Sequence, residues 1–322
     1  MSEATRPTGW RVWWLGSRPR TLGAGLVPVV VGTAAAGHII WWRFAAALVV
    51  AAGLQVGVNF ANDYFDGTRG VDTHARLGPP RLTQSGAATP RQVLVASLAS
   101  LFVAGVCGLA LALVTAPVPI LAVGALALIA AFLYSGGPRP YAGLGLGEVM
   151  VFLFFGLLAT CGTAFVMVET IPATAWWCGS TMGLLAVAIL VANNLRDIPT
   201  DDAAGKRTLA VRLGDAKTRL LYGACIVAAF ATIAIGATVH VWAKDVGMSP
   251  WALFGLAAWP LAIRPMERVG TASGRDLIPV LVGTAATHAA CGSLMVIGLA
   301  LSHTTRAGKL PAALDLLLPH LR

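Results

Sequence analysis

The chain has 322 residues, of which 57% are hydrophobic and 11% charged, with 36 glycines and a formal net charge of +9. Soluble domains contain about 45–50% apolar residues, so this composition excludes an ordinary soluble globular protein. It favours a polytopic membrane protein, in which glycine is also frequent. The five cysteines lie in apolar stretches without paired spacing, which argues against a disulfide framework or a zinc site.

Membrane-spanning helices are predicted along most of the chain, because a span requires about 20 mostly apolar residues. In chain order the predicted spans are residues 22–42, 44–62, 92–115, 118–135, 146–168, 174–195, 218–242, 248–264 and 279–301. The sequence therefore predicts an all-α bundle of about nine transmembrane helices in one domain, 22–301. The segment 1–21 precedes it, without the features of a removable signal peptide, and the tail 302–322 is a candidate interfacial helix.

The basic residues predict the orientation, because cytoplasmic segments of membrane proteins are enriched in Lys and Arg. With the N-terminus in the cytoplasm, the opposite face keeps only five of the 23 basic residues: Arg43, Lys244, Arg306, Lys309 and Arg322. We therefore expect an integral cell membrane protein whose second, fourth, sixth and eighth spans end on the cytoplasmic side.

Six of the 14 acidic residues gather in two short stretches that this topology places on the cytoplasmic side. "NFANDYFDGTRGVD" (59–72) follows the second span, and "NNLRDIPTDD" (193–202) follows the sixth. Asparagine and aspartate recur there at intervals of three or four residues, so each set shares one face if the helix continues through it. Such side chains are costly near a hydrocarbon core and therefore indicate a functional site.

Amide and carboxylate oxygens are the ligands that Mg²⁺ prefers, and proteins usually hold Mg²⁺ through one or two carboxylates together with substrate phosphates. Two such patches among arginines and lysines predict two Mg²⁺ ions that bridge one diphosphate. The alternative is that the acids form solvated helix ends or pair with nearby arginines. Two matched patches on one side of the membrane favour the metal site.

The two stretches resemble the paired aspartate motifs of the UbiA superfamily of intramembrane prenyltransferases, and the resemblance covers nearly the whole chain. "SRPRTL" (17–22), "GPPRLTQSG" (78–86) and "LGLGEVMVFLFFG" (144–156) are similar to the menaquinone-biosynthesis branch of that superfamily. The resemblance implies nine helices, with both motifs in cytoplasmic loops after helices 2 and 6. It also implies Mg²⁺-dependent transfer of a polyprenyl group from polyprenyl diphosphate to 1,4-dihydroxy-2-naphthoate, with loss of carbon dioxide, giving demethylmenaquinone.

Matching the motifs residue by residue assigns a set of metal ligands. They are Asn62, Asp63, Asp66, Asp72, Asp197 and Asp201. Asp72 lies two residues beyond the last aspartate of the family's first motif, where this chain has Gly70. Asp63, Asp66, Asp197 and Asp201 are also expected to be catalytic, because metal charge makes diphosphate a better leaving group.

Further residues of the cytoplasmic side are candidates for binding the two substrates. Cations would neutralise diphosphate, tyrosine rings would stabilise a developing allylic cation, and an acid at the start of the fifth span would orient the acceptor. The candidates are Asn59, Asn193, Arg20, Arg81, Arg139, Tyr134, Tyr141, Glu148, Lys206 and Arg207. The positive-inside bias and the interfacial aromatic belt offer a structural alternative for most of them.

Two other functions stay open. A secondary transporter would place ionisable residues and broken helices deep within the spans of both halves, whereas these acids gather at one rim. A related prenyltransferase acting on 4-hydroxybenzoate, homogentisate, haem or a phosphosugar would share both aspartate motifs. The "GTRGVD" spacing and the "GPPRLTQSG" segment favour the naphthoate acceptor.

Overall fold

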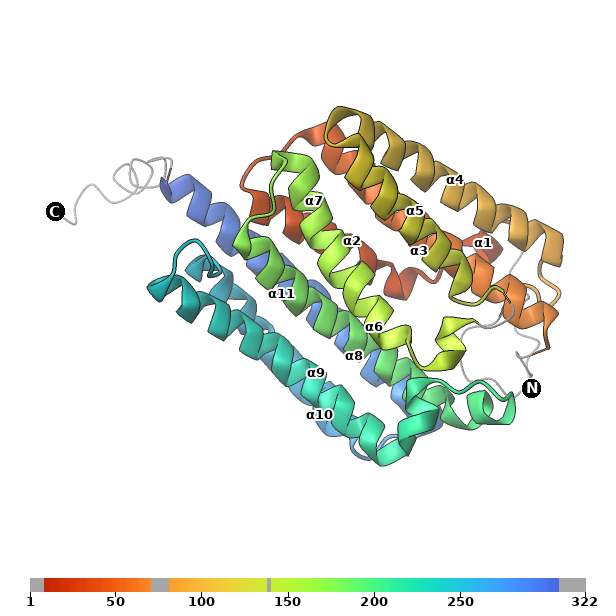
Figure 1. The fold of residues 1–322 in the computed structure, drawn as a ribbon. Coiled ribbons are helices and arrows are strands. Elements are labelled where there is room, and N and C mark those ends of the chain that lie inside the picture. The colour runs from red at the N-terminus through yellow and green to blue at the C-terminus, as the bar shows by residue number, and fades with distance from the viewer. Residues whose placement is uncertain (1–8, 71–80, 138–139, 307–322) are drawn as a thin grey trace.

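The computed structural model describes residues 9–70, 81–137 and 140–306, and within these residues the chain forms helices and no β-strand. The helices lie side by side in one bundle (Figure 1). The prediction of an all-α fold is therefore confirmed. In chain order the elements are α1 (Trp10–Gly16), α2 (Pro19–Ala36), α3 (Trp41–Thr68), α4 (Pro90–Val114), α5 (Pro117–Leu133), η1 (Tyr141–Leu144), α6 (Gly147–Val151), η2 (Phe152–Leu158), α7 (Ala159–Val168), α8 (Ala173–Ala203), α9 (Leu209–Trp242), η3 (Pro250–Ala258), α10 (Trp259–Val269), η4 (Gly274–Asp276) and α11 (Leu277–Arg306).

Six stretches of the described chain are long and apolar enough to cross a membrane, namely α3, α4, the continuous run α6–η2–α7, α8, α9 and the run from η4 into α11. α2 and α5 are apolar but shorter. Each predicted span coincides with a helical element, although the eighth is the 3₁₀ helix η3 continued by α10. The protein is thus an integral membrane protein, and the count of nine spans stays a prediction.

The second acidic stretch lies on a helix, and so does the first as far as Thr68. α3 continues beyond the predicted end at residue 62 to Thr68, and α8 continues beyond residue 195 to Ala203. The expectation of loops after these spans is wrong because hydropathy marks only where a helix leaves lipid. Backbone hydrogen bonding continues wherever polar side chains find partners. At the end of α3 Asp63 finds them in the loop at Leu82 and Thr83. At the end of α8 Asp197 finds its partner Arg196 on the same helix.

Local sequence signals explain where several helices begin. The hydroxyl of Thr89 accepts a hydrogen bond from the backbone N–H of Gln92, whose side chain accepts one from the backbone N–H of Thr89, which makes a capping box at the start of α4. Pro19 and Pro117 occupy the first turns of α2 and α5, where a missing N–H costs nothing.

The bundle is held together by close backbone approaches at glycines, as is typical of membrane helices. Gly156 in the π-helical segment η2 faces Gly179 and Gly183 of α8. A Cβ atom at Gly156 would lie 2.4 Å from the Cα of Gly183 and 2.6 Å from the carbonyl oxygen of Gly179. Backbone atoms cannot yield as a flexible side chain does, so this contact requires glycine.

Gly156→Val is therefore expected to destabilise the protein by roughly 3 kcal/mol or more, the upper range for overpacking a core. Gly124→Val on α5 is the matched control, since a Cβ at Gly124 meets no atom within 4 Å. Thermal unfolding of the two variants in the same detergent checks this. Equal melting temperatures would show that η2 and α8 do not pack through these glycines.

Arg43 ties three helices together at the end of the bundle opposite the acidic stretches. Its guanidinium donates to the carbonyl oxygens of Val166 at 2.8 Å and Val114 at 3.2 Å, at the ends of α7 and α4. Glu169 lies 3.5 Å from the same group. One basic residue outside the predicted cytoplasmic set thus has a structural role.

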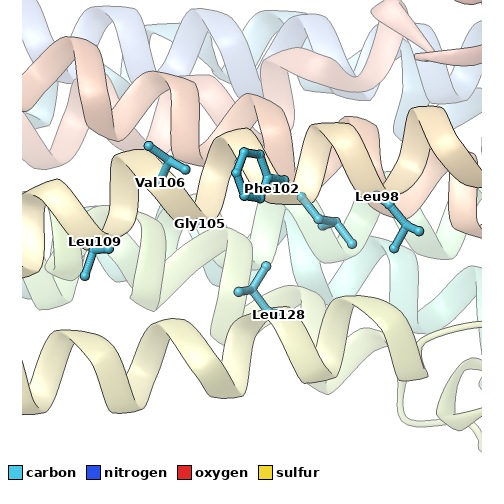
Figure 2. A pocket seen from close by; sticks show the side chains of 7 residues that line it. Leu98, Phe102, Gly105, Val106, Leu109 and Leu128 are labelled. Carbon is cyan, nitrogen blue, oxygen red and sulfur yellow. The ribbon is translucent and has the colours of Figure 1, made fainter.

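An apolar groove of about 560 Å³ lies between α4 and α5 (Figure 2). It is lined by Leu98, Leu101, Phe102, Gly105, Val106, Leu109 and Leu128. These residues offer no group that can bind a phosphate or move a proton. The groove therefore belongs to the lipid-facing surface.

Candidate active site

The polar residues at the end of α3 form a stripe on one face, at intervals of three or four residues. The stripe consists of Gln55, Asn59, Asn62, Asp63 and Asp66. Each of the five is at most 8% exposed. Buried polar groups require hydrogen-bond partners, and the described contacts of this stripe reach four other parts of the chain.

The two amides furthest from the end of α3 contact the first turn of α2 and the residues just before it. The Gln55 side chain donates a hydrogen bond of 2.7 Å to the carbonyl oxygen of Thr21. The Asn59 side chain donates one of 2.9 Å to the carbonyl oxygen of Ser17. Asn59, predicted to bind substrate, thus holds the start of α2.

Asn62 contacts the end of α5, because its side-chain oxygen accepts a hydrogen bond from the hydroxyl of Ser135. Arg69 reinforces this contact by donating to the carbonyl oxygens of Ser135 at 2.8 Å and Gly137 at 2.5 Å. The ends of α3 and α5 are therefore fixed to each other.

Both oxygens of Asp63 accept hydrogen bonds from the backbone of the segment before α4. The N–H of Leu82 lies 2.7 Å from Oδ2, and the N–H of Thr83 lies 2.9 Å from Oδ1. The Asp63 carboxylate is 3% exposed, and these two donors stabilise its charge.

Asp66 lies between two cations from different parts of the chain. Its Oδ2 is 3.2 Å from Nη2 of Arg81 and 3.8 Å from Nζ of Lys206. Lys206 follows α8, so this carboxylate of the first acidic stretch contacts the segment that follows the second. The ends of α3 and α8 lie at the same end of the bundle (Figure 1).

The second acidic stretch is organised around a buried arginine. Arg196 donates to both oxygens of Asp197, with two hydrogen bonds of 2.7 Å, and to the side-chain oxygen of Asn193 at 2.9 Å. Such a bidentate pair fixes the plane of the carboxylate. Asp201 lies one helical turn further along α8.

Glu148 and Tyr134 lie beside the two acidic stretches. The buried carboxylate of Glu148, at the start of α6, accepts a hydrogen bond of 3.0 Å from the side chain of Asn194. The phenol of Tyr134 lies within electrostatic range of Glu148, Arg18, Asp66 and Asp201. Tyr134 directly precedes Ser135, whose hydroxyl bonds to Asn62, so it lies at the same end of the bundle as the first stretch.

Tyr141 supports Tyr134 from the side. The two rings pack edge to face with centroids 5.4 Å apart. The Tyr141 hydroxyl donates to the carbonyl oxygen of Ala130 at 2.8 Å, so Tyr141 orients its neighbour and its own hydroxyl is already engaged.

Of the remaining predicted site residues, Arg207 is not brought together with this group. Arg207 lies at the surface, where its side chain is 63% exposed and pairs at 3.4 Å with Asp202, which is 60% exposed. Asp72, Arg139 and the side chain of Arg20 lie outside the described residues.

Several residues of the site were missed in the sequence. They are Arg18, Ser135, Asn194 and Arg196. The sequence does contain one indication for Arg196, because this residue lies inside "NNLRD", next to a candidate metal ligand. The positive-inside bias is sufficient to explain a basic residue at this position, so the sequence alone does not assign Arg196 to the site. Nothing in the sequence indicates the role of Ser135, since its contact with Asn62 depends on where α5 ends in space.

The carboxylate and amide oxygens of the two acidic stretches are suitable ligands for a hard divalent cation. Within the described residues, no group of three or more His, Cys, Asp or Glu side chains lies in metal-binding proximity. A magnesium site does not require such a group, since one or two carboxylates and the phosphates of a substrate suffice. Asp66 and Asp197 keep acceptor capacity beyond their contacts with cations, because a carboxylate has about four lone-pair positions.

Comparisons with known proteins identify the family of the chain. Residues 25–276 match the model of the UbiA prenyltransferase family. A 1,4-dihydroxy-2-naphthoate octaprenyltransferase of Mycobacterium tuberculosis is 46% identical over 277 residues, which are 84% of this chain and 91% of that protein. One of Escherichia coli is 34% identical over 307 residues, which are 90% of this chain and 95% of that protein.

The fold is similar to that of a UbiA homologue from Archaeoglobus fulgidus whose structure was solved bound to GPP and Mg²⁺. That structure has a TM-score of 0.59 at 17% identity and covers 88% of this chain and 99% of its own. Sequence and fold therefore lead to the same conclusion: the chain belongs to the UbiA prenyltransferase family.

Proposed function

We propose that the protein transfers a polyprenyl group from polyprenyl diphosphate to 1,4-dihydroxy-2-naphthoate, with loss of the ring carboxylate as carbon dioxide, in menaquinone biosynthesis. The observation that carries this proposal is the contact of Asp66 with Lys206, because it joins the first acidic stretch to the segment after the second. The relatives named 1,4-dihydroxy-2-naphthoate octaprenyltransferase support the choice of acceptor.

The diphosphate end of the donor lies between the two acidic stretches. Arg81 and Lys206 neutralise part of its charge, and both are already within 4 Å of Asp66. Asn62, Asp66, Asp197 and Asp201 offer the oxygens that would hold two Mg²⁺ ions. Bound Mg²⁺ supplies Lewis acidity that makes diphosphate a better leaving group.

The allylic carbon of the donor gains positive charge as its bond to the diphosphate oxygen lengthens. The ring of Tyr134 offers the π face that favours this charge, and its phenol interacts electrostatically with Glu148, Asp66 and Asp201 as well as with Arg18. Water must be kept from that carbon. Leu82 contributes, since it lies in a buried apolar cluster with Phe60 and Val93 beside the acidic stripe.

The acceptor binds on the side of α6. Glu148 accepts a hydrogen bond from Asn194 and keeps acceptor capacity for a ring hydroxyl of the naphthoate. Such a bond increases the electron density of the ring, whose carbon then attacks the allylic centre. The basic residues near these groups support a reaction on the cytoplasmic side, since the positive-inside bias favours that side for Lys and Arg.

Purified protein with Mg²⁺ and a polyprenyl diphosphate, offered a panel of aromatic acids, tests the proposal. We expect diphosphate release that depends on 1,4-dihydroxy-2-naphthoate, and a product mass that shows prenylation with loss of carbon dioxide. Prenylation of 4-hydroxybenzoate or homogentisate instead would keep the family chemistry and change the acceptor. Ion-coupled uptake by proteoliposomes without diphosphate release would indicate a transporter.

A further inference from the structure

We propose that Asp63 positions the loop that carries Arg81 and leaves contact with the metal-bound diphosphate to Asp66 and the second stretch. The inference rests on the proposed function in that Arg81 is taken to bind diphosphate. The two carboxylates stand three residues apart on one helix face, yet their described partners differ in kind. Asp63 accepts two backbone N–H groups, whereas Asp66 faces the side chains of Arg81 and Lys206.

The loop 81–88 is compact and contacts α3 at several points. Its own hydrogen bonds join the N–H of Ser85 to the carbonyl of Arg81 at 3.0 Å and the N–H of Ala88 to the carbonyl of Leu82 at 3.2 Å. Leu82 and Ala88 also belong to a buried apolar cluster with Val12, Phe60 and Val93. A Cβ at Gly67 would lie 2.8 Å from Thr83, so α3 and this loop are in close contact.

Asp63 completes this arrangement, because two consecutive N–H groups that point at one carboxylate form an anion-binding turn. The residue immediately before the first of these N–H groups is Arg81, whose guanidinium reaches Asp66. Fixing the backbone at Leu82 and Thr83 therefore fixes the point from which the Arg81 side chain extends. Asp63 acts on the substrate through Arg81, which makes it a positioning residue.

Asp63→Asn tests the loop contact directly, because an amide offers one acceptor oxygen where the carboxylate offers two. Hydrogen exchange of the purified protein, with no substrate, should be about tenfold or more faster at Leu82 and Thr83, since charge-assisted hydrogen bonds are lost. Asp66→Asn, which removes no bond to the loop backbone, is the control and should leave exchange at these two amides near the wild-type rate.

Metal binding separates a positioning residue from a ligand. Binding of Mn²⁺ in the presence of inorganic pyrophosphate should stay within about threefold of wild type in Asp63→Asn and weaken at least about tenfold in Asp66→Asn, the range for losing a charge-assisted contact. If Asp63→Asn weakens Mn²⁺ binding as much as Asp66→Asn does and leaves exchange at Leu82 and Thr83 unchanged, Asp63 is a metal ligand and the inference is wrong.

A double-mutant cycle tests whether Asp63 acts through Arg81. The kcat/KM for the prenyl donor should fall in Asp63→Asn and in Arg81→Ala, and the double variant should be no worse than Arg81→Ala alone within about threefold, because coupled residues are not additive. Multiplicative losses would overturn the inference. Leu82→Ala loosens the loop and leaves the Asp63 carboxylate unchanged, so it should reproduce the faster exchange expected for Asp63→Asn. It replaces Asp63→Asn as the test variant if that protein does not fold.

Two of these measurements, hydrogen exchange and Mn²⁺ binding, fail separately from the proposed function. Exchange and Mn²⁺ binding are read without any prenyl acceptor, so they hold or fail whichever ring is alkylated. A wild-type protein that transfers no prenyl group would refute the proposed function and leave the exchange result standing.

Discussion

Asp66→Asn is expected to lower kcat/KM for prenyl transfer by about 1,000-fold or more, which corresponds to about 4 kcal/mol of transition-state stabilisation. The carboxylate lies between Arg81 and Lys206 at 3.2 and 3.8 Å. The negative charge of Asp66 would hold Mg²⁺ against the diphosphate. It also keeps the side chains of Arg81 and Lys206 where they can contact the diphosphate. Asparagine keeps the size of the side chain and removes the charge, so the loss reports electrostatics and not packing.

The matched control for Asp66→Asn is Asp245→Asn, the same chemical change at an exposed position in the connection between α9 and η3. It should keep wild-type turnover within about twofold, as is usual for surface substitutions. Because removing Asp66 leaves Arg81 buried without this partner, melting temperature must be measured alongside turnover. Folded Asp66→Asn protein with wild-type kcat/KM would remove Asp66 from the proposed mechanism.

Much of the fold was predictable, because apolar segments in lipid must satisfy their own backbone hydrogen bonds and so form helices. Each predicted span coincides with a helical element for this reason. The ends of α3 and α8 lie beyond the predicted spans, because hydropathy does not register the ion pairs that accommodate Asp66 and Asp197 at these helix ends. Arg81 reaches Asp66 from a loop, which is a tertiary contact, whereas Arg196 pairs with Asp197 locally on α8.

The candidate site was predictable in its residue types and less so in their roles. Spacing on one helix face groups Asn62, Asp63 and Asp66, and the structure shows that their partners differ in kind. Asn62 contacts the hydroxyl of Ser135, Asp63 contacts the loop backbone at Leu82, and Asp66 contacts the side chain of Arg81. Spacing specifies which residues share a face, whereas the role of each depends on what packs against that face. The basic residues show the same limit: Arg81 is buried in the site, while Arg207 pairs with Asp202 at the surface.

Asp197→Asn and Asp202→Asn are expected to have very different effects on activity, because one carboxylate of α8 is buried and the other lies at the surface. Asp197 is buried and bound through both oxygens by Arg196, and its replacement should lower kcat/KM about 1,000-fold, as expected for a charge that stabilises the departing diphosphate. The Mg²⁺ concentration needed for half-maximal activity should rise as well.

Asp202 supplies the control, because its side chain is 60% exposed and its ion pair with Arg207 is screened by solvent. Asp202→Asn should therefore keep turnover within about threefold of wild type, the scale of a surface ion pair of at most about 1 kcal/mol. Steady-state kinetics at several Mg²⁺ concentrations on both folded variants checks this pair. Equal losses in the two variants would mean that net negative charge at the end of α8, and not a specific carboxylate, supports the reaction. An unaffected Asp197→Asn would mean that Arg196 and Asp197 are a structural ion pair.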